Sequence, residues 1–397
     1  MTPTNADAWR DGLHGELRAI ARWWLEHVID FDRGAVVGAV SDTGRADAAA
    51  PLSLVYVARL LWFFSALARR SGEAGHRAAA DLCCALLLRD FPDPRYGGLY
   101  WEIAADGRPL ARKKQTYGLA FAVYALAEHH RAGGDDESLQ QATGLARLIE
   151  ERLFDCEHGG VFEALDRDWR PLADVRLGPT DLNADKTLNT HLHLLEAWTA
   201  LVRSAPTAAP RLRELLQLYL ARFTTAPEGT AVGFYTRDWT PLDAGHSPGH
   251  AIEASWLLCE AADALGDPAL QSAARSAALD LAEGVLTRAL DGDGGTVAEL
   301  RDGRVSDPRR VWWVQAEAMV GFFNAWQIGG DARYLQASRN SWAFIRAHQV
   351  DPQHGEWRWF SALDAAAPTA GFAGPWKGPY HNGRALMEML RRLAPQR

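Results

Sequence analysis

This sequence has few of the features that mark a secreted, membrane-spanning or metal-dependent small protein. Its 397 residues include only four cysteines. None of these cysteines forms a CxxC pair, so neither a zinc finger nor a thioredoxin-type motif is supported. No run reaches ~18 uninterrupted apolar residues, so we expect no membrane span. The N-terminal stretch MTPTNADAWRDGLHGEL contains no apolar signal-peptide core, and we therefore expect a cytoplasmic protein.

An excess of basic charge is also missing. Lysine and arginine number 42 against 50 aspartates and glutamates, which gives a formal net charge of −8 spread along the chain. Because no basic stripe is present, we expect no nucleic-acid partner. The sequence also lacks a GxSxG nucleophile motif and a phosphate-binding glycine loop. Hydrophobic residues make up 48% of the chain, which is enough for a large core.

A short pattern recurs along the whole chain: an acidic or turn residue, then glycine, then an apolar or aromatic run. Two clear copies are DPRYGGLYWEI and DCEHGGVFEAL. Six copies occur, at 30–40, 93–103, 155–165, 226–236, 291–301 and 351–361. Their spacing of roughly 60–70 residues is typical of a supersecondary unit repeated around a structure.

Each copy lies between two stretches with helical periodicity. The pattern at 146–154 predicts a helix that ends at a glycine turn, and 115–132 predicts a helix that follows one. Six units of helix, hairpin and helix predict twelve helices. We expect one domain over 1–397, a closed (α/α)6 barrel with short β-hairpin loops on one face. An open solenoid is the alternative, but GPWKGPYHNGR (374–384) is too rich in aromatic and polar residues for a solenoid cap.

Polar residues occur at the same level of every unit, at the starts of helices that follow the turns. They are Arg59; Tyr117; Asn189, His191, His193 and Glu196; His250 and Glu253; Arg310, Trp312, Trp313, Gln315 and Glu317; and Trp376, Lys377, Tyr380, His381, Asn382 and Arg384. In a closed ring these residues meet in one cavity. Taken singly, each has a structural explanation: a histidine or tryptophan can be core. Taken together, three histidines, an arginine and two glutamates would be a costly core.

Several alternatives remain open at this point. Arg59 can be a buried ion-pair partner of Glu253 or Glu317. His193, His250, Glu253 and His381 are acceptable zinc ligands, although HxxE is not the HExxH arrangement and Arg59 would repel a cation. Two opposed carboxylates, Glu253 and Glu317, would suit a glycosidase. An acid three residues from a histidine more naturally orients that histidine. His191 is two positions from His193, so we expect a structural role for it.

The motifs RVWWVQAEA, GPWKGPYHNGR, GHAIEASW and NTHLHLLEAW closely resemble the N-acylglucosamine 2-epimerase superfamily, nearest its cellobiose and mannose 2-epimerases. The resemblance runs from about Arg22 to the C-terminus. It implies an (α/α)6 barrel that interconverts aldoses epimeric at C2 and needs no metal or other cofactor. The substrate would be a mono- or disaccharide. Because the sequence has no unusual exposed apolar stretch that would favour a tight dimer, we expect a monomer or weak homodimer. An aldose–ketose isomerase or a sugar-binding regulator on the same scaffold is the alternative.

The resemblance also implies roles for individual residues. His250 and His381 would exchange protons with the two faces of C2, and His193 would help to open the sugar ring. Arg59 would hold the enediolate oxygens, and Glu253 would orient His250. Substrate contacts would come from Tyr117, Asn189, Asp181, Trp313, Glu317 and Trp376. The chain departs from the family at Pro248 and Ala251, where an aromatic residue and an acid are usual.

Overall fold

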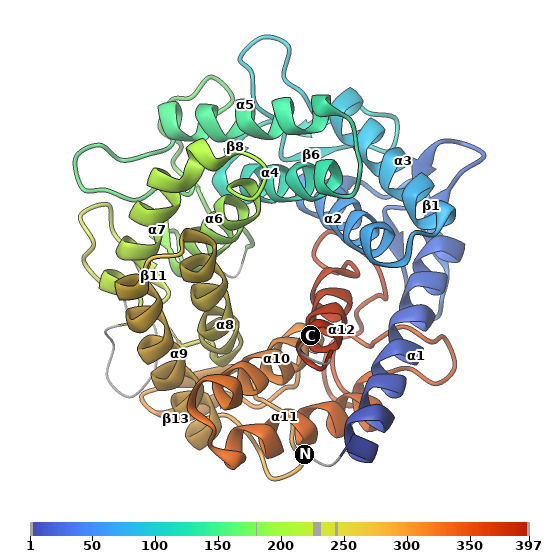
Figure 1. Cartoon of the computed structure of the whole chain (residues 1–397). Coiled ribbons are helices and arrows are strands. Elements are labelled where there is room, and N and C mark those ends of the chain that lie inside the picture. Colours follow the sequence, from blue (N-terminus) through green and yellow to red (C-terminus); the bar gives the residue numbers. More distant parts are fainter. Residues whose placement is uncertain (1–2, 180, 225–231, 243–244, 395–397) are drawn as a thin grey trace.

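Two concentric rings of helices form the molecule (Figure 1). The computed structural model describes residues 3–394 except 180, 225–231 and 243–244, and twelve α-helices lie in that part of the chain. The inner ring consists of α2 (Leu54–Ser71), α4 (Thr116–Arg131), α6 (Leu188–Leu201), α8 (Pro248–Leu265), α10 (Trp312–Gly329) and α12 (Tyr380–Arg392). The outer ring consists of α1 (Pro3–His27), α3 (Ala74–Asp90), α5 (Asp136–Arg152), α7 (Ala209–Arg222), α9 (Pro268–Arg288) and α11 (Ala332–Phe344).

The hydrophobic pattern of each helix decides its ring. Every residue of α2 from Leu54 to Ala68 is buried, because an inner helix has neighbours on all sides. In α5, by contrast, the buried residues Ser138, Ala142, Leu145, Ala146 and Ile149 form one stripe at helical spacing. The remaining surface of such an outer helix faces solvent. The alternation of these two patterns along the chain therefore produces an inner and an outer layer.

The inner ring is closed. Each inner helix packs against the next, from α2 through α4, α6, α8 and α10 to α12, and α12 packs against α2. The N-terminal helix α1 packs on α12 as its outer partner. Hydrogen bonds from Trp24 to Glu356 (2.6 Å) and from Trp357 to Glu16 (2.7 Å) tie this helix to the C-terminal part of the chain. The predicted (α/α)6 barrel is thus confirmed, and the open solenoid is wrong.

Short strands on one side of the barrel connect the units. They are β1 (Ile29–Asp30), β2 (Ala35–Val36), β3 (Ala39–Val40), β4 (Ala46–Asp47), β5 (Leu52–Ser53), β6 (Glu102–Ile103), β7 (Pro109–Ala111), β8 (Lys114–Gln115), β9 (Ala164–Leu165), β10 (Lys186–Thr187), β11 (Phe234–Tyr235), β12 (Glu299–Arg301) and β13 (Arg304–Asp307). All pairings are antiparallel. Three of them, β5 with β6, β8 with β9 and β10 with β11, join the strand before an inner helix to a strand of the next unit.

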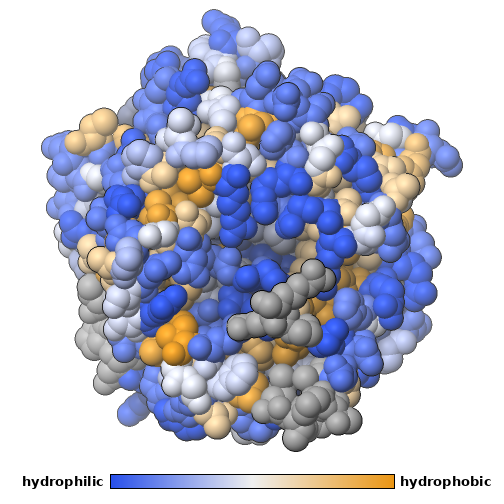
Figure 2. Space-filling view, in the orientation of Figure 1, coloured by the Kyte–Doolittle hydropathy of each residue, from blue (hydrophilic) through white to orange (hydrophobic). Residues whose placement is uncertain are grey.

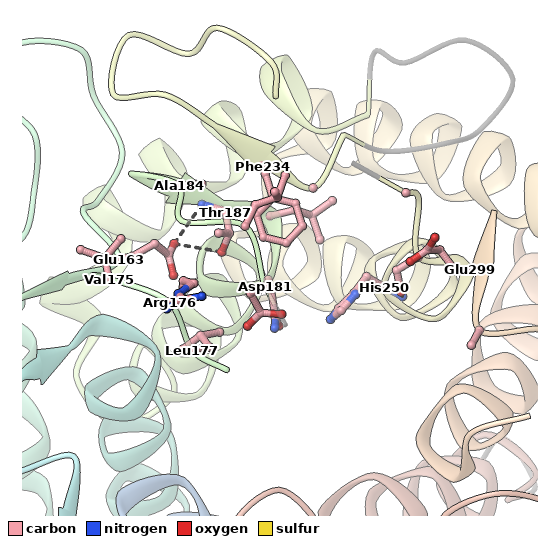
Figure 3. A pocket seen from close by; sticks show the side chains of 17 residues that line it. Glu163, Val175, Arg176, Leu177, Asp181, Ala184, Thr187, Phe234, His250 and Glu299 are labelled. Carbon is pink, nitrogen blue, oxygen red and sulfur yellow. Dashed lines mark hydrogen bonds between the residues drawn. The ribbon is translucent and has the colours of Figure 1, made fainter. Parts of the chain in front are cut away.

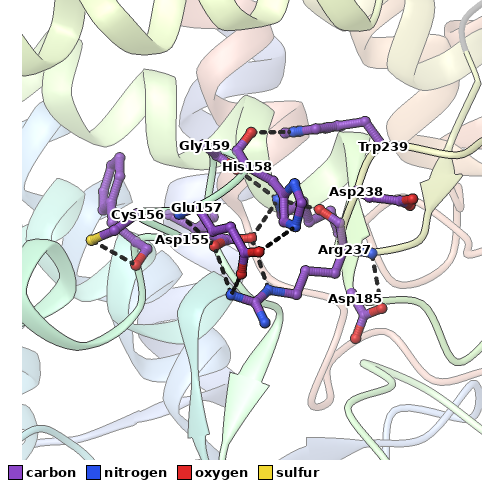
Figure 4. A network of polar contacts seen from close by, with 12 residues as sticks. Asp155, Cys156, Glu157, His158, Gly159, Asp185, Arg237, Asp238 and Trp239 are labelled. Carbon is purple, nitrogen blue, oxygen red and sulfur yellow. Dashed lines mark hydrogen bonds and ion pairs between the residues drawn. The ribbon is translucent and has the colours of Figure 1, made fainter.

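A buried aspartate fastens the connection between α5 and α6 to the connection between α7 and α8 (Figure 4). Asp155 lies in the third glycine turn and accepts hydrogen bonds from Lys186 (2.9 Å) and Arg237 (3.1 Å). Burial opposes ionisation of this carboxyl, but the two cations hold its pKa well below the usual range. Trp239 covers Lys186 and donates its indole N–H to the carbonyl of His158 (2.8 Å). We call this arrangement the Asp155 clasp.

The preceding unit repeats the clasp. Asp93 accepts from Lys114 (3.1 Å) and Arg167 (2.8 Å), and Trp169 donates to the carbonyl of Tyr96 (2.8 Å). Lys114 and Lys186 are both fully buried, and each lies two residues before the first residue of an inner helix. The glycine-turn repeat therefore anchors the loops from which the inner helices begin. In the fourth copy of the repeat, positions 226–231 lie outside the described residues.

The surface seen in Figure 2 is mostly hydrophilic, with only small and separate apolar areas. Among the described residues, no helix has the length and apolar character needed to cross a membrane.

Candidate active site

The inner helices begin around one cavity of about 220 Å³. Its lining contains all but two of the residues to which the resemblance assigns a catalytic or substrate role; the exceptions are Glu317 and Asp181. The expectation that all the polar residues at the helix starts meet in this cavity is wrong for His191, Glu196, Arg310, Gln315, Lys377, Tyr380, Asn382 and Arg384, which do not line it. The lining residues are Arg59, Tyr117, Asn189, His193, His250, Glu253, Trp312, Trp313, Trp359, Trp376 and His381. Tyr117, Asn189, His250, Trp313 and His381 all lie in the first three residues of their helices. Because helix N-termini carry partial positive charge, five of them around one cavity favour a bound anion.

Arg59 is a buried cation without a carboxylate partner among the described residues. Its guanidinium donates to the carbonyl of Trp376 (2.9 Å) and to the hydroxyl of Tyr117 (2.9 Å). It also lies over the Phe121 ring, 4.6 Å from the centroid. The ion pair with Glu253 or Glu317 that the sequence left open is therefore wrong. A cation held only by neutral groups is available to an anionic ligand.

Glu317 orients His381 from behind. Its Oε1 lies 2.7 Å from Nδ1 of His381 and both side chains are buried. Since a carboxylate only accepts, Nδ1 carries the hydrogen and Nε2 is left as the free ring nitrogen of this cavity-lining histidine. Burial, with Arg59 and Arg384 close by, lowers the pKa of His381 well below its ordinary value. Glu317 therefore acts through His381 in this structure and does not line the cavity.

His193 has the same arrangement with Glu196 one helical turn further along α6. Nδ1 of His193 lies 3.0 Å from Oε2 of Glu196. Burial lowers the pKa of His193, and the neighbouring carboxylate opposes this shift. Burial raises and Arg384 lowers the pKa of Glu196, with a net result of about 2. Glu196 is thus an anion that fixes the tautomer of His193.

His250 differs from both, because no carboxylate hydrogen-bonds its ring among the described residues. Its ring packs on Trp313, with centroids 4.8 Å apart. Gly249 makes this contact possible, since a Cβ there would meet Trp313 at 2.5 Å. Pro248, one of the departures from the family pattern, is the first residue of α8 after the Ser247 cap, where proline is favourable. Burial lowers the pKa of His250 to about 3, so the imidazole is a neutral base at physiological pH.

The predicted pairing of Glu253 with His250 is wrong. Glu253 accepts a hydrogen bond from Arg384 (2.5 Å), and its Oε1 lies 3.9 Å from Nδ1 of His381. Helical spacing places His250 and Glu253 on the same face of α8, but the guanidinium of Arg384 donates to the carboxylate instead. Arg384 also donates to Glu196 and to Glu317 (2.7 Å).

Glu253, Glu317 and His381 each offer a possible metal-ligating atom, and these atoms lie within 4.8 Å of one another. Arg384 donates to the same oxygen of Glu317 that contacts His381, and to Oε1 of Glu253. A cation is therefore already between the two carboxylates. The donor set fits a guanidinium better than a second, added positive charge.

A second cavity, of about 270 Å³, adjoins the first and shares Asn189 and His250 with it. Asp181 and Arg176 line this outer cavity, and Asp181 points toward the same space as His250 (Figure 3). Apolar side chains such as Leu177 and Phe234 form much of the remaining wall. Asp181 thus lines the cavity beside the histidine cavity, and its Oδ2 also accepts from the backbone N–H of Gly178 (2.8 Å).

His191 has the structural role that its position in the sequence predicts. Its Nδ1 lies 2.7 Å from the carbonyl of Thr187, and Nε2 accepts from the N–H of Val161 (3.1 Å).

The sequence did not reveal the role of Glu196, Arg384, Trp312 or Trp359. Glu196 and Arg384 were among the polar residues predicted at the starts of the inner helices, but only the closed ring shows that the two side chains contact each other. Trp359 belongs to the sixth glycine turn, whose aromatic run WRWF was the available signal.

These features define an enzyme of the (α/α)6-barrel class, with neutral imidazoles and an unpaired guanidinium around a cavity suited to an anionic intermediate. The chain belongs to the N-acylglucosamine 2-epimerase family, whose model matches residues 36–383. The resemblance seen in the sequence is thereby confirmed, and with it the assignment as a carbohydrate 2-epimerase.

Individual relatives agree with this membership. The chain is 38% identical to a cellobiose 2-epimerase of Bacteroides fragilis, over 94% of this chain and 95% of that protein. It superposes on the structure of a cellobiose 2-epimerase from Spirochaeta thermophila DSM 6192 with a TM-score of 0.89 at 37% identity, covering 98% of both chains. A more distant relative, a D-mannose isomerase of Thermobifida fusca, is 28% identical over 83% of each chain.

Proposed function

We propose that this chain interconverts the glucose and mannose configurations at the reducing end of a disaccharide of the cellobiose type. The observation that carries the proposal is the pair of adjoining cavities that share Asn189 and His250. The inner cavity holds the groups that move protons, and the outer one offers Asp181 and an apolar wall to a second sugar. The similarity to cellobiose 2-epimerases supports the same substrate class.

The reaction begins with ring opening, because the C2–H of an aldose is acidic only when C1 is a carbonyl. His193 is suited to this step, since its Nδ1 is held by Glu196 and its Nε2 is free to exchange a proton with the ring or anomeric oxygen. The open chain then turns C2 toward His250 and His381.

His250 and His381 act as the base and the acid on opposite faces of C2. One histidine removes the C2 proton and the electron pair passes into the C1–C2 bond as an enediolate forms. The other histidine, in its protonated form, returns a proton to the opposite face. Burial lowers the pKa of both rings, and the negative charge of the enediolate opposes this shift when the intermediate forms.

Arg59 holds the enediolate oxygens, because this cation of the cavity is paired with none of the carboxylates that the structure describes. Tyr117 and Asn189 position hydroxyl groups from the starts of α4 and α6. Trp313 and Trp376 offer aromatic faces to the C–H faces of the sugars. Charge stabilisation therefore comes from side chains, and we propose that the reaction needs no metal or other cofactor.

The test is incubation of the purified protein with glucose, mannose, cellobiose and lactose in deuterated water, with product analysis by chromatography and NMR. We expect the C2 epimer of the disaccharides, with deuterium at C2. A ketose labelled at C1 would instead identify an aldose–ketose isomerase. Unchanged sugars would refute both activities.

Two variants test the roles of the histidines. His250→Ala and His381→Ala should each abolish epimerisation while folding, followed by circular dichroism, is retained. Each variant should still exchange the C2 proton of one epimer with solvent, because one base remains. Epimerisation in either variant, or exchange of the same epimer in both, would refute the assignment of one histidine to each face.

A further inference from the structure

Three buried carboxylates converge on one guanidinium beneath the sugar cavity. Glu196, Glu253 and Glu317 are 4%, 0% and 0% exposed, and Arg384 is 2% exposed. All three accept hydrogen bonds from Arg384. With every group ionised, three negative charges would oppose one positive charge in a space closed to solvent. Because buried unpaired charge is costly, such a group takes up a proton instead.

The hydrogen-bond donors show where that proton resides. Glu196 accepts from Arg384, from the Tyr380 hydroxyl (2.5 Å) and from His193 (3.0 Å). Glu317 likewise accepts from Arg384, from His381 and from the Trp256 indole (3.0 Å).

In the part of the chain that the structure describes, Arg384 is the only donor to Glu253, and its hydrogen bond goes to Oε1. Oε2 of Glu253 is buried and has no hydrogen-bond partner among the described residues, although the side chain lines the sugar cavity. The carboxyl with the fewest donors is the least stabilised as an anion, so the proton belongs on Glu253.

We propose, on the basis of the 2-epimerase function above, that Glu253 is a catalytic residue that is a neutral carboxylic acid at physiological pH and donates a hydrogen bond from Oε2 to an oxygen of the bound aldose. This role replaces the orientation of His250. Arg384 selects the oxygen that carries the proton, because its hydrogen bond to Oε1 favours the carbonyl form there. The Oε2 hydroxyl then points to the substrate, and its hydrogen bond stabilises the enediolate without adding a charge to the site.

Charged and titratable groups approach Glu253 from every side. They are Arg384, His381 and Tyr380 on α12, Glu317 on α10, Glu196 and His193 on α6, Tyr117 on α4, Tyr219 on α7 and Arg59 on α2. Burial and the charge of Glu317 raise the pKa of Glu253 well above its ordinary value, and Arg384 only partly opposes them. The balance of charges therefore agrees with the donor pattern.

Glutamine and leucine at position 253 separate the possible roles. A glutamine reproduces the neutral acid, because its carbonyl accepts from Arg384 and its amide donates toward the sugar. We expect E253Q to retain kcat for cellobiose within about tenfold of the unmodified protein. E253L has no donor and should lose about 10²–10³-fold, as for removal of one donor to a developing oxyanion. E317Q is the matched control: it removes the carboxylate that orients His381 and should lose at least about 10²-fold.

Two results would overturn the proposal. If E253Q loses as much activity as E317Q, Glu253 works as a carboxylate; if E253L is as active as E253Q, it donates nothing. The infrared spectrum gives a test that is independent of activity. At pH 9, where Glu163 with its pKa of about 7 is ionised, the unmodified protein should show the C=O band of a buried carboxylic acid, and E253Q should lack it.

Absence of that band from the unmodified protein also overturns the proposal. Failure of the proposed function gives a different result: the unmodified protein then leaves all four sugars unchanged. The infrared band does not depend on activity, so it still reports whether Glu253 is protonated.

Discussion

Removal of the Arg59 guanidinium tests whether this side chain stabilises the enediolate. Arg59 is 4% exposed and has no carboxylate partner among the described residues, so its charge is not cancelled locally. A unit charge about 4 Å from an oxyanion contributes about 4 kcal/mol at an effective dielectric constant of about 20. That energy corresponds to about 10³ in kcat. We therefore expect Arg59→Met to lower kcat by about 10³.

Arg59→Lys gives a graded comparison, because lysine keeps the charge but not the fork that contacts Trp376 and Tyr117. We expect it to lose about 10–10²-fold, between the unmodified protein and Arg59→Met. Steady-state assays with cellobiose, together with deuterium exchange at C2, measure both variants. Arg70→Met, at the end of the same helix, is the control and should be fully active. A loss confined to KM, or an Arg59→Met kcat within tenfold of normal, would show that Arg59 only binds the ground state.

Three further predictions concern other parts of the molecule. Asp155→Asn leaves the buried charge of Lys186 without its carboxylate and should lower the free energy of unfolding by about 3–5 kcal/mol in urea titrations; a change under about 1 kcal/mol would contradict the clasp. Because burial lowers the pKa of His250 to about 3, its imidazole stays neutral as the pH falls from 7 to 5, so the acid limb of kcat/KM should lie below pH 5, and a midpoint near 6.5 would contradict this. Asp181→Ala should raise KM for cellobiose and leave KM for mannose unchanged; equal effects on both sugars would remove Asp181 from the second-sugar contact.

The architecture was predictable because the glycine turns repeat in step with the helices. Copies such as 93–103 and 155–165 contain the aspartates of the two clasps, so the same short motif marks both a turn and an anchor. Helix-start positions were predictable for the same reason. Once the ring closes, Tyr117, Asn189, His250, Trp313 and His381 must share one level. Local periodicity and repeat spacing carry this information without any knowledge of long-range contacts.

The partners of the charged groups were not predictable from the sequence. Glu253 and His250 are three residues apart, and that spacing made a local pair the natural expectation. Arg384 is 131 positions from Glu253 along the chain, and only the packing of α12 between α10 and α2 brings it to the carboxylates. A buried guanidinium offers five donors, and it competes more strongly for a carboxylate than a neutral imidazole does. Such competition depends on three-dimensional distance, which spacing within one helix does not report.

The three histidines of the cavity therefore differ in ways that bear on their chemistry. His193 and His381 each have a carboxylate at Nδ1, which fixes the tautomer and raises the basicity of Nε2. Among the described residues, no carboxylate is hydrogen-bonded to the ring of His250, which packs on Trp313. Burial lowers the pKa of both His250 and His381, so both imidazoles start neutral, and the charge of the enediolate is what favours protonation of the ring that returns the proton. The two directions of epimerisation use these two histidines in opposite roles, and only in one direction is the ring that removes the C2 proton the one held by a carboxylate.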